Sequence, residues 1–154
     1  MIYDLIAYQA EKELVKPAII DNDISISYGK LLELVSWLAN GLSFIGIEAG
    51  DRLSFFGEDC YQEVIWYLAC FKIGAIACPL YEGLRGKELE YIIEQTTPKL
   101  VITTFNSVKY LSEIETKVNF DFDIFVIENQ SHEMTFGRLY KKIKHETIIV
   151  NKNN

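Results

Sequence analysis

Residues 50–80, which read GDRLSFFGEDCYQEVIWYLACFKIGAIACPL, give the clearest indication of the fold class. Residues 52–56 have the composition of a strand, and apolar residues in 61–73 recur at helical spacing. Four of them are expected to face a core: Val64, Ile65, Leu68 and Phe71. Gly74 is placed to end this helix, and residues 75–80 form an apolar run of strand length. The stretch therefore predicts strand, helix and strand in succession.

The same alternation extends outward in both directions. Residues 17–20 and 24–27 flank the turn-rich triplet Asp21-Asn22-Asp23, which predicts a hairpin. A helical stripe from Leu31 to Ile45 follows, with Ser27 placed as its N-cap and Gly46 at its end. Further elements are expected downstream, namely helices at 86–96, 108–118 and 136–143, and strands at 100–102, 124–127 and 147–150.

This order of elements predicts an α/β fold, with a mostly parallel sheet flanked by helices on both faces and an N-terminal β-hairpin. Residues 1–150 are expected to form one domain, and the polar residues 151–154 a frayed tail. The 154 residues are enough to bury a core, and 49% of them are apolar.

Charge and cysteine usage exclude several classes of function. The chain has 15 basic and 22 acidic residues, a net charge of -7, which disfavours contact with nucleic acid or anionic membranes. No basic and apolar leader or membrane-length apolar run is present in the sequence. Cys60, Cys70 and Cys78 form no C-x-x-C pair, so a reducing, cytoplasmic location is expected, without a disulfide frame or zinc site.

Candidate chemical groups are weak when each is compared with its structural alternative. The segment Gly83-Leu84-Arg85-Gly86-Lys87 has two residues between its glycines and is followed by Glu88, whereas a P-loop needs four and then Ser or Thr. It is interpreted as a turn and a helix start. His132 and His145 lie in no catalytic or metal pattern. We therefore expect no catalytic, cofactor-binding or metal-binding residue in this chain.

Short motifs nevertheless resemble a known family. They are ISYGKL at 26–31, GDR at 50–52, KIGA at 72–75 with Pro79-Leu80, and KEL at 87–89. In order and spacing they resemble the opening motifs of the adenylate-forming superfamily, which includes acyl-CoA synthetases, luciferases and the adenylation domains of peptide synthetases. Residues 73–82 are most similar to acetate and other acyl-CoA ligases. The resemblance implies structural roles for Ser27, Tyr28, Leu31, Gly50, Asp51, Arg52, Gly74, Ala75, Pro79, Leu80 and Glu88.

The chain departs from the family pattern in two places. Lys30 stands where an acidic residue is usual, and Tyr81-Glu82-Gly83 replaces a common Asn-Pro. The first change removes a capping-box partner, and the second alters a loop whose family role is mainly structural.

The resemblance also implies a reaction for complete members of the family. ATP and a carboxylate give an acyl-adenylate and pyrophosphate, and coenzyme A or a carrier thiol then takes the acyl group, with magnesium as cofactor. The family's phosphate loop, Thr/Ser-Gly-Thr-Thr-Gly-x-Pro-Lys, does not occur in this sequence, and residues 147–150 run into Asn151-Lys152-Asn153-Asn154. The chain is therefore expected to be a truncated N-terminal subdomain, without cofactors and inactive alone.

Two other functions stay open. The core-rich composition and the apolar strand at 147–150 favour an interaction module, which would pair with itself or with a full-length ligase. Alternatively, the chain is one half of a split ligase whose remaining motifs lie on a second chain.

Overall fold

The fold is described from a computed structural model, which covers residues 2–127, 139–143 and 146–150. The chain divides into two compact units. The first unit comprises residues 1–51 and 59–77, and the second comprises residues 52–58 and 78–154. Each unit is described by itself.

The first unit is built from three helices and a hairpin. Its elements are α1 (Ile2–Lys12), β1 (Pro17–Asp21), β2 (Ile24–Ser27), α2 (Tyr28–Phe44) and α3 (Tyr61–Ile73). The two strands pair antiparallel around Asn22, whose φ of 50° is one that Asn adopts readily in tight turns. Apolar residues three or four apart give α2 its buried stripe, which includes Leu31, Leu34, Val35, Leu38 and Leu42.

Two details of this unit differ from the sequence patterns. Helix α1 is not among the elements that these patterns predict, and its residues Ile2, Leu5 and Tyr8 are exposed. In α3 the buried side is formed by Ile65, Trp66, Leu68, Ala69 and Cys70. The expectation that Val64 faces the core is wrong, since this side chain is 41% exposed.

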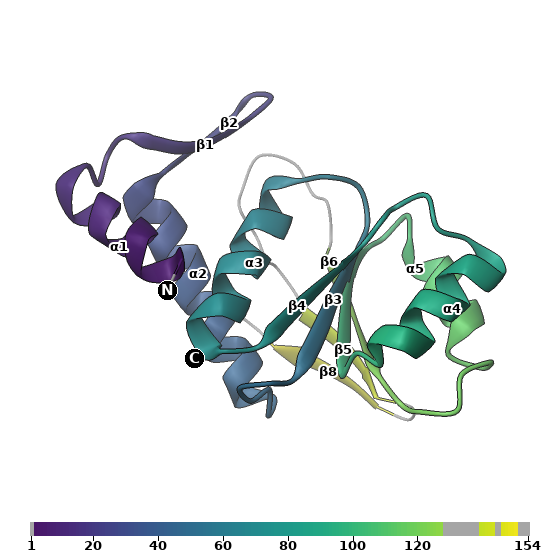
Figure 1. The fold of residues 1–154 in the computed structure, drawn as a ribbon. Helices are drawn as coiled ribbons and strands as arrows, with labels where there is room; N and C mark the ends of the chain where they lie inside the picture. Colours follow the sequence, from purple (N-terminus) through teal and green to yellow (C-terminus); the bar gives the residue numbers. More distant parts are fainter. Residues whose placement is uncertain (1, 128–138, 144–145, 151–154) are drawn as a thin grey trace. The chain divides into compact units, whose positions relative to one another are not determined.

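The second unit is built on a sheet (Figure 1). The strands lie in the order β4-β3-β5-β6-β7-β8. Their bounds are β3 (Arg52–Phe56), β4 (Ile76–Leu80), β5 (Leu100–Thr104), β6 (Asp123–Ile127), β7 (Leu139–Ile143) and β8 (Glu146–Val150). Strand β5 runs parallel to β3 with Leu53 beside Leu100, and parallel to β6. All five residues of β5 are buried, as expected for a strand in the middle of a parallel sheet.

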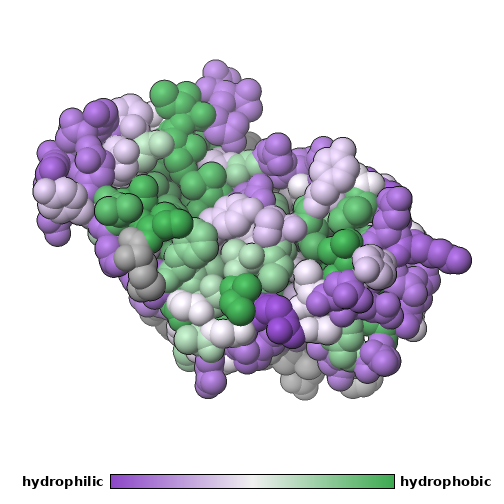
Figure 2. All heavy atoms as spheres, in the orientation of Figure 1, coloured by the Kyte–Doolittle hydropathy of each residue, from purple (hydrophilic) through white to green (hydrophobic). Residues whose placement is uncertain are grey.

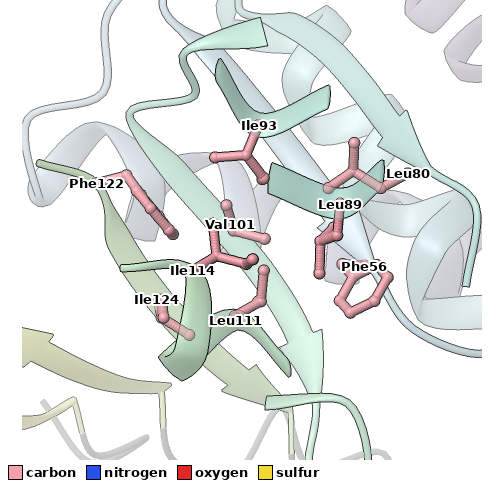
Figure 3. Packing of buried hydrophobic residues seen from close by; sticks show 9 residues of the cluster. All are labelled: Phe56, Leu80, Leu89, Ile93, Val101, Leu111, Ile114, Phe122 and Ile124. Carbon is pink, nitrogen blue, oxygen red and sulfur yellow. The ribbon is translucent and has the colours of Figure 1, made fainter. Parts of the chain in front are cut away.

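Helices α4 (Gly86–Thr96) and α5 (Val108–Ile114) cover one face of this sheet. Leu89 and Ile93 of α4 and Leu111 and Ile114 of α5 lie against residues from four strands (Figure 3). The strand residues are Leu80, Phe56, Val101 and Ile124, and Phe122 completes the cluster. Burying one such aliphatic or aromatic side chain contributes about 1.5–3 kcal/mol. This cluster therefore contributes strongly to the stability of the second unit.

The α/β class, the mostly parallel sheet flanked by helices and the N-terminal hairpin are confirmed. One predicted helix is wrong. Residues 139–143 of the helix expected at 136–143 form β7, which pairs antiparallel with β6 and with β8. Hydrogen bonds to two neighbouring strands outweigh a helical apolar pattern only two turns long. Residues 136–138 of that expected helix and residues 151–154 lie outside the described part of the chain.

No helix among the described residues is long and apolar enough to cross a membrane.

Candidate functional site

The first family motif forms the start of α2. The Ser27 hydroxyl accepts a hydrogen bond from the Lys30 amide at 3.2 Å, which satisfies one of the free amides at the helix start. The Tyr28 amide donates to the Lys16 carbonyl at 3.0 Å and ties the helix to the segment before the hairpin. Leu31 is buried. These three residues position backbone and fill the core of the first unit.

The second and third motifs meet in the first unit, at a contact that we call the 50/74 junction, formed by residues 48–51 and 74–76. The Gly50 amide donates to the Gly74 carbonyl at 2.9 Å, and the Ile76 amide donates to the Asp51 carbonyl at 2.8 Å. The Asp51 carboxylate accepts from the Glu48 amide at 2.8 Å and closes the turn. The junction therefore fixes where α3 ends and where β4 begins.

Both glycines of the junction have left-handed backbone conformations. The φ angle is 88° at Gly50 and 76° at Gly74, and side-chain-bearing residues rarely adopt such values. Gly74 also approaches Ala49 closely, because a Cβ at position 74 would lie 3.1 Å from the Ala49 Cβ. The next residue, Ala75, is buried, and its amide donates to the Cys70 carbonyl at 2.9 Å.

Arg52 links the first residue of β3 to the end of α4 within the second unit. Its guanidinium donates to the Thr96 carbonyl and to the Thr97 hydroxyl. The last carbonyls of a helix lack partners within the helix and carry partial negative charge, so a cation is well placed there. The Arg52 carbonyl in turn accepts from the Lys99 amide at 2.8 Å. The Arg52 side chain therefore fixes the backbone at the end of α4, and all of these hydrogen bonds lie within the second unit.

The surroundings of the remaining motif residues also indicate a structural role. Pro79 is exposed in β4, and Leu80 belongs to the core of the second unit. Glu88 is exposed in the first turn of α4, where its charge favours the helix dipole without any ligand.

The segment 83–87 forms a turn and the start of α4. Arg85 occupies the N-cap position, and its guanidinium donates to the Glu82 carbonyl and, at 2.7 Å, to the Leu84 carbonyl. The same guanidinium lies 3.9 Å from the centre of the Tyr110 ring. Arg85 and, to a smaller extent, Lys109 lower the pKa of the Tyr110 hydroxyl. Of the two basic residues in this segment, Arg85 is therefore bound to neighbouring protein groups, an arrangement that does not fit a phosphate cradle.

In the described part of the chain, neither the cysteines nor the His, Asp and Glu side chains form a reactive or metal-binding centre. Cys60, Cys70 and Cys78 form no disulfide, and Cys70 is fully buried. Burial raises the pKa of both the Cys60 and the Cys78 thiol, which keeps each in its unreactive form. Residues 2–127, 139–143 and 146–150 bring together no cluster of three or more His, Cys, Asp or Glu side chains suited to a metal. His132 and His145 lie outside the described residues.

The carboxyl ends of β3 and β5 carry polar residues that the sequence patterns do not single out. The chain crosses from β3 to β4 on one side and from β4 to β5 on the other, so β3 and β5 meet where the strand order reverses. Ligands of open α/β sheets often bind at such a place. Here the Thr103 hydroxyl donates to the Phe56 carbonyl at 2.6 Å, and the Asn106 amide donates to the Glu58 carboxylate at 3.2 Å.

Close packing also marks this edge, because a Cβ at Gly57 would lie 2.7 Å from a Thr104 methyl carbon. The polar side chains here bind one another or the backbone of the same edge: Thr103 bonds the Phe56 carbonyl, and Asn106 bonds Glu58. The sequence signal that could have indicated this edge is the group of polar residues soon after each buried strand, Glu58-Asp59 after the first and Asn106-Ser107 after the second.

Comparison with known proteins gives the family. A family model described as AMP-binding enzyme matches residues 6–145. A nonribosomal peptide synthetase of Malbranchea aurantiaca is 34% identical over 117 residues, which are 76% of this chain and 5% of the relative. The medium-chain fatty-acid–CoA ligase of Escherichia coli (strain K12) is 37% identical over 86 residues, 55% of this chain and 15% of that ligase.

Solved structures agree with this. Coronafacic acid ligase from Pectobacterium brasiliense has a TM-score of 0.75 at 26% identity, over 81% of this chain and 25% of that one. A putative long-chain fatty-acid CoA ligase from Rhodopseudomonas palustris, at 19% identity and a TM-score of 0.77 over 85% of this chain, shares the fold. The chain spans 5% of the first of these curated relatives and 15% of the second. With its motif residues arranged as a structural framework, the chain belongs to the AMP-binding enzyme family.

Proposed function

We propose that this chain is the N-terminal, scaffold-forming part of an acyl-CoA synthetase-like, ATP-dependent adenylate-forming ligase, and that it is inactive alone. The observation that carries the proposal is the 50/74 junction. There, motif residues bind one another's backbone through the bonds from Gly50 to Gly74 and from Ile76 to Asp51. Groups used in this way position elements and do not act on a substrate.

The reaction assigned to the complete enzyme is carboxylate activation. ATP and an acyl carboxylate would give an acyl-adenylate and pyrophosphate, and coenzyme A would then receive the acyl group, with magnesium as cofactor. The names of the ligase relatives support this class. Adenylation needs donors and a cation around the phosphates and a magnesium site. Arg85 is bound to carbonyls of its own loop, and the described acidic residues form no metal cluster, so we assign none of these tasks to this chain.

A cytoplasmic location is part of the proposal. It rests on the three cysteines, which form no disulfide in the structure, as is usual in a reducing compartment.

Calorimetric titration of the purified chain with magnesium-ATP, and separately with a non-hydrolysable acyl-adenylate analogue, tests the proposal. We expect no binding at micromolar concentrations and no acyl-CoA formation from ATP, coenzyme A and a range of fatty acids. Acyl-CoA formation that stops when magnesium is removed would refute the proposal. If ATP does bind, a Lys87→Ala variant shows whether the segment 83–87 holds the phosphates, and Lys99→Ala serves as the charge-matched control.

A second candidate function is an interaction module, or one half of a split ligase. Apolar side chains gather over α1 and the hairpin (Figure 2). Among them Leu5 is 68% exposed and Ile20 is 74% exposed. In addition, β8 is the last strand in the sheet order and pairs with β7 alone among the described strands. An exposed apolar patch and a free strand edge both favour association.

Light scattering over a range of protein concentrations tests this second function. Self-association that weakens in a Leu5→Lys variant would support the interaction module. A strictly monomeric chain that also does not co-purify with the remaining segments of a ligase, expressed as a separate polypeptide, would exclude both forms of the second function.

A further inference from the structure

The first turn of α3 is capped by a residue from another part of the chain. At the N-cap position stands Cys60, whose sulfur, a weak acceptor, lies near the Gln62 and Glu63 amides but makes no capping hydrogen bond of normal geometry. Instead the Tyr61 amide donates to a carboxylate oxygen of Asp21 at 3.3 Å. Asp21 is the last residue of β1 and lies 40 residues earlier in the sequence. The hairpin therefore supplies the capping group that the helix's own N-cap residue does not provide.

The hairpin turn orients this carboxylate. The Asn22 side-chain amide donates to the second oxygen of Asp21 at 3.0 Å, and Asp21 itself is paired with Ile24 across the turn. One oxygen thus faces the turn and the other faces α3. A negative charge at this end of a helix is favourable because it bonds a free amide and interacts with the helix dipole.

We propose that the β1–β2 hairpin is a latch on α3, in which Asp21 holds the first helical turn closed and its release opens that turn and exposes Cys60. The two parts are coupled through the Asp21 carboxylate, which belongs to the hairpin and bonds the first turn of α3. The hairpin contacts α2 and is anchored there by the fully buried Ile26, whereas the N-cap residue of α3 gives this helix no side-chain cap, so the Asp21 carboxylate links the first turn of α3 to an anchored hairpin. Docking of the hairpin and formation of the first turn therefore stabilise each other.

Cys60 is a built-in reporter of this latch. Its thiol is partly buried beside Asp21, and burial is the main cause of its raised pKa. Opening the latch would hydrate the thiol and increase its reactivity. The two other cysteines are internal references. Cys70 is fully buried further along the same helix and reports unfolding of the whole unit, and Cys78 lies in the second unit.

The experiment is alkylation of the full chain with iodoacetamide at neutral pH, with the rate at each cysteine read by mass spectrometry. The test variant is Asp21→Ala. The matched control is Asp23→Ala, which removes the same charge from an exposed position in the same turn. Losing an N-cap shifts the opening equilibrium of a helix end by about fivefold. We expect Cys60 to react about fivefold faster in Asp21→Ala than in Asp23→Ala, with Cys70 unchanged.

Two results would overturn the latch. Equal Cys60 rates in the two variants would mean that Asp21 does not hold the turn. A parallel rise at Cys60 and Cys70 would mean that the helix opens as one body, with no separate first turn. If Asp21→Ala does not fold, amide hydrogen exchange on the unmodified chain decides the question. The Tyr61 amide should then exchange together with the hairpin amides, and exchange in step with the middle of α3 would refute the proposal.

Discussion

Replacing Gly74 with alanine should destabilise the chain more than replacing Gly50, although both glycines have the same kind of backbone. A left-handed conformation costs an alanine about 1 kcal/mol at either position. At Gly50 the added Cβ would meet no atom within 4 Å, so strain is the whole effect. At Gly74 the added Cβ would lie 3.1 Å from the Ala49 Cβ.

The contact between the added Cβ at position 74 and the Ala49 Cβ can be relieved only if the backbone at one of the two residues moves. The Ala49 methyl group is fixed to the turn, and the next residue, Gly50, donates to the Gly74 carbonyl. Moving Ala49 away lengthens this hydrogen bond, which contributes about 1 kcal/mol. We therefore expect a loss of about 2–3 kcal/mol for Gly74→Ala against about 1 kcal/mol for Gly50→Ala.

Urea unfolding followed by circular dichroism gives both free energies. Ala49→Gly removes the opposing methyl group and completes a double-mutant cycle with Gly74→Ala. The coupling energy should be about 1 kcal/mol in the direction of rescue. Equal losses at the two glycines, or a coupling near zero, would show that the close approach of residues 49 and 74 is not what requires glycine at position 74.

Three further changes have defined outcomes. Ser27→Ala should cost about 1 kcal/mol of unfolding free energy, because the N-cap of α2 is lost, whereas Ser25→Ala, on an exposed position of β2, should have little effect in the same urea assay. Arg52→Ala should lower the stability of the second unit by about 1 kcal/mol, since carbonyl and hydroxyl acceptors at the end of α4 lose their donor, and faster amide exchange at the end of α4 would show it. Arg85→Ala should raise the pKa of Tyr110, which nuclear magnetic resonance of the labelled ring can follow. Because the folded-state pKa of this phenol is depressed, its stabilising effect exists only at alkaline pH and disappears as the pH falls through that pKa, so the variant should lose no stability from this source at pH 7.

Elements with strong local signals could be predicted from the sequence. Helix α2 begins after its capping residue Ser27, and α4 has the bounds 86–96 that its apolar spacing predicts. The helix α1 was missed although Tyr3, Ile6, Ala7 and Ala10 lie on its less exposed side at helical spacing, because the exposed apolar residues Ile2, Leu5 and Tyr8 hide this period in the sequence. Strand β7 was beyond reach for a different reason, since its conformation is set by pairing with β6 and β8.

The contacts of the candidate site also divide into those that a local sequence pattern indicates and those that depend on residues far away in the sequence. The motifs indicated that Gly50 and Gly74 serve the architecture, but their hydrogen bond to each other joins segments more than twenty residues apart, and no local pattern reports such a contact. The cap that Asp21 provides to α3 was equally hidden, because a sequence window around Cys60 offers the adjacent Asp59 as a capping residue and cannot show a carboxylate 40 residues earlier.

The position of β3 between β4 and β5 has a consequence for the order of events during synthesis. Leu53 pairs with Leu100, so β3 acquires its second neighbour only after about fifty more residues have been added, which takes a few seconds on a ribosome. Until then Phe55 and Phe56, both buried in the finished fold, face water or other chains. Strand β3 is thus the first strand of this sheet to be made but must wait for both of its neighbours, and during that interval the nascent chain is exposed to aggregation and in need of a chaperone.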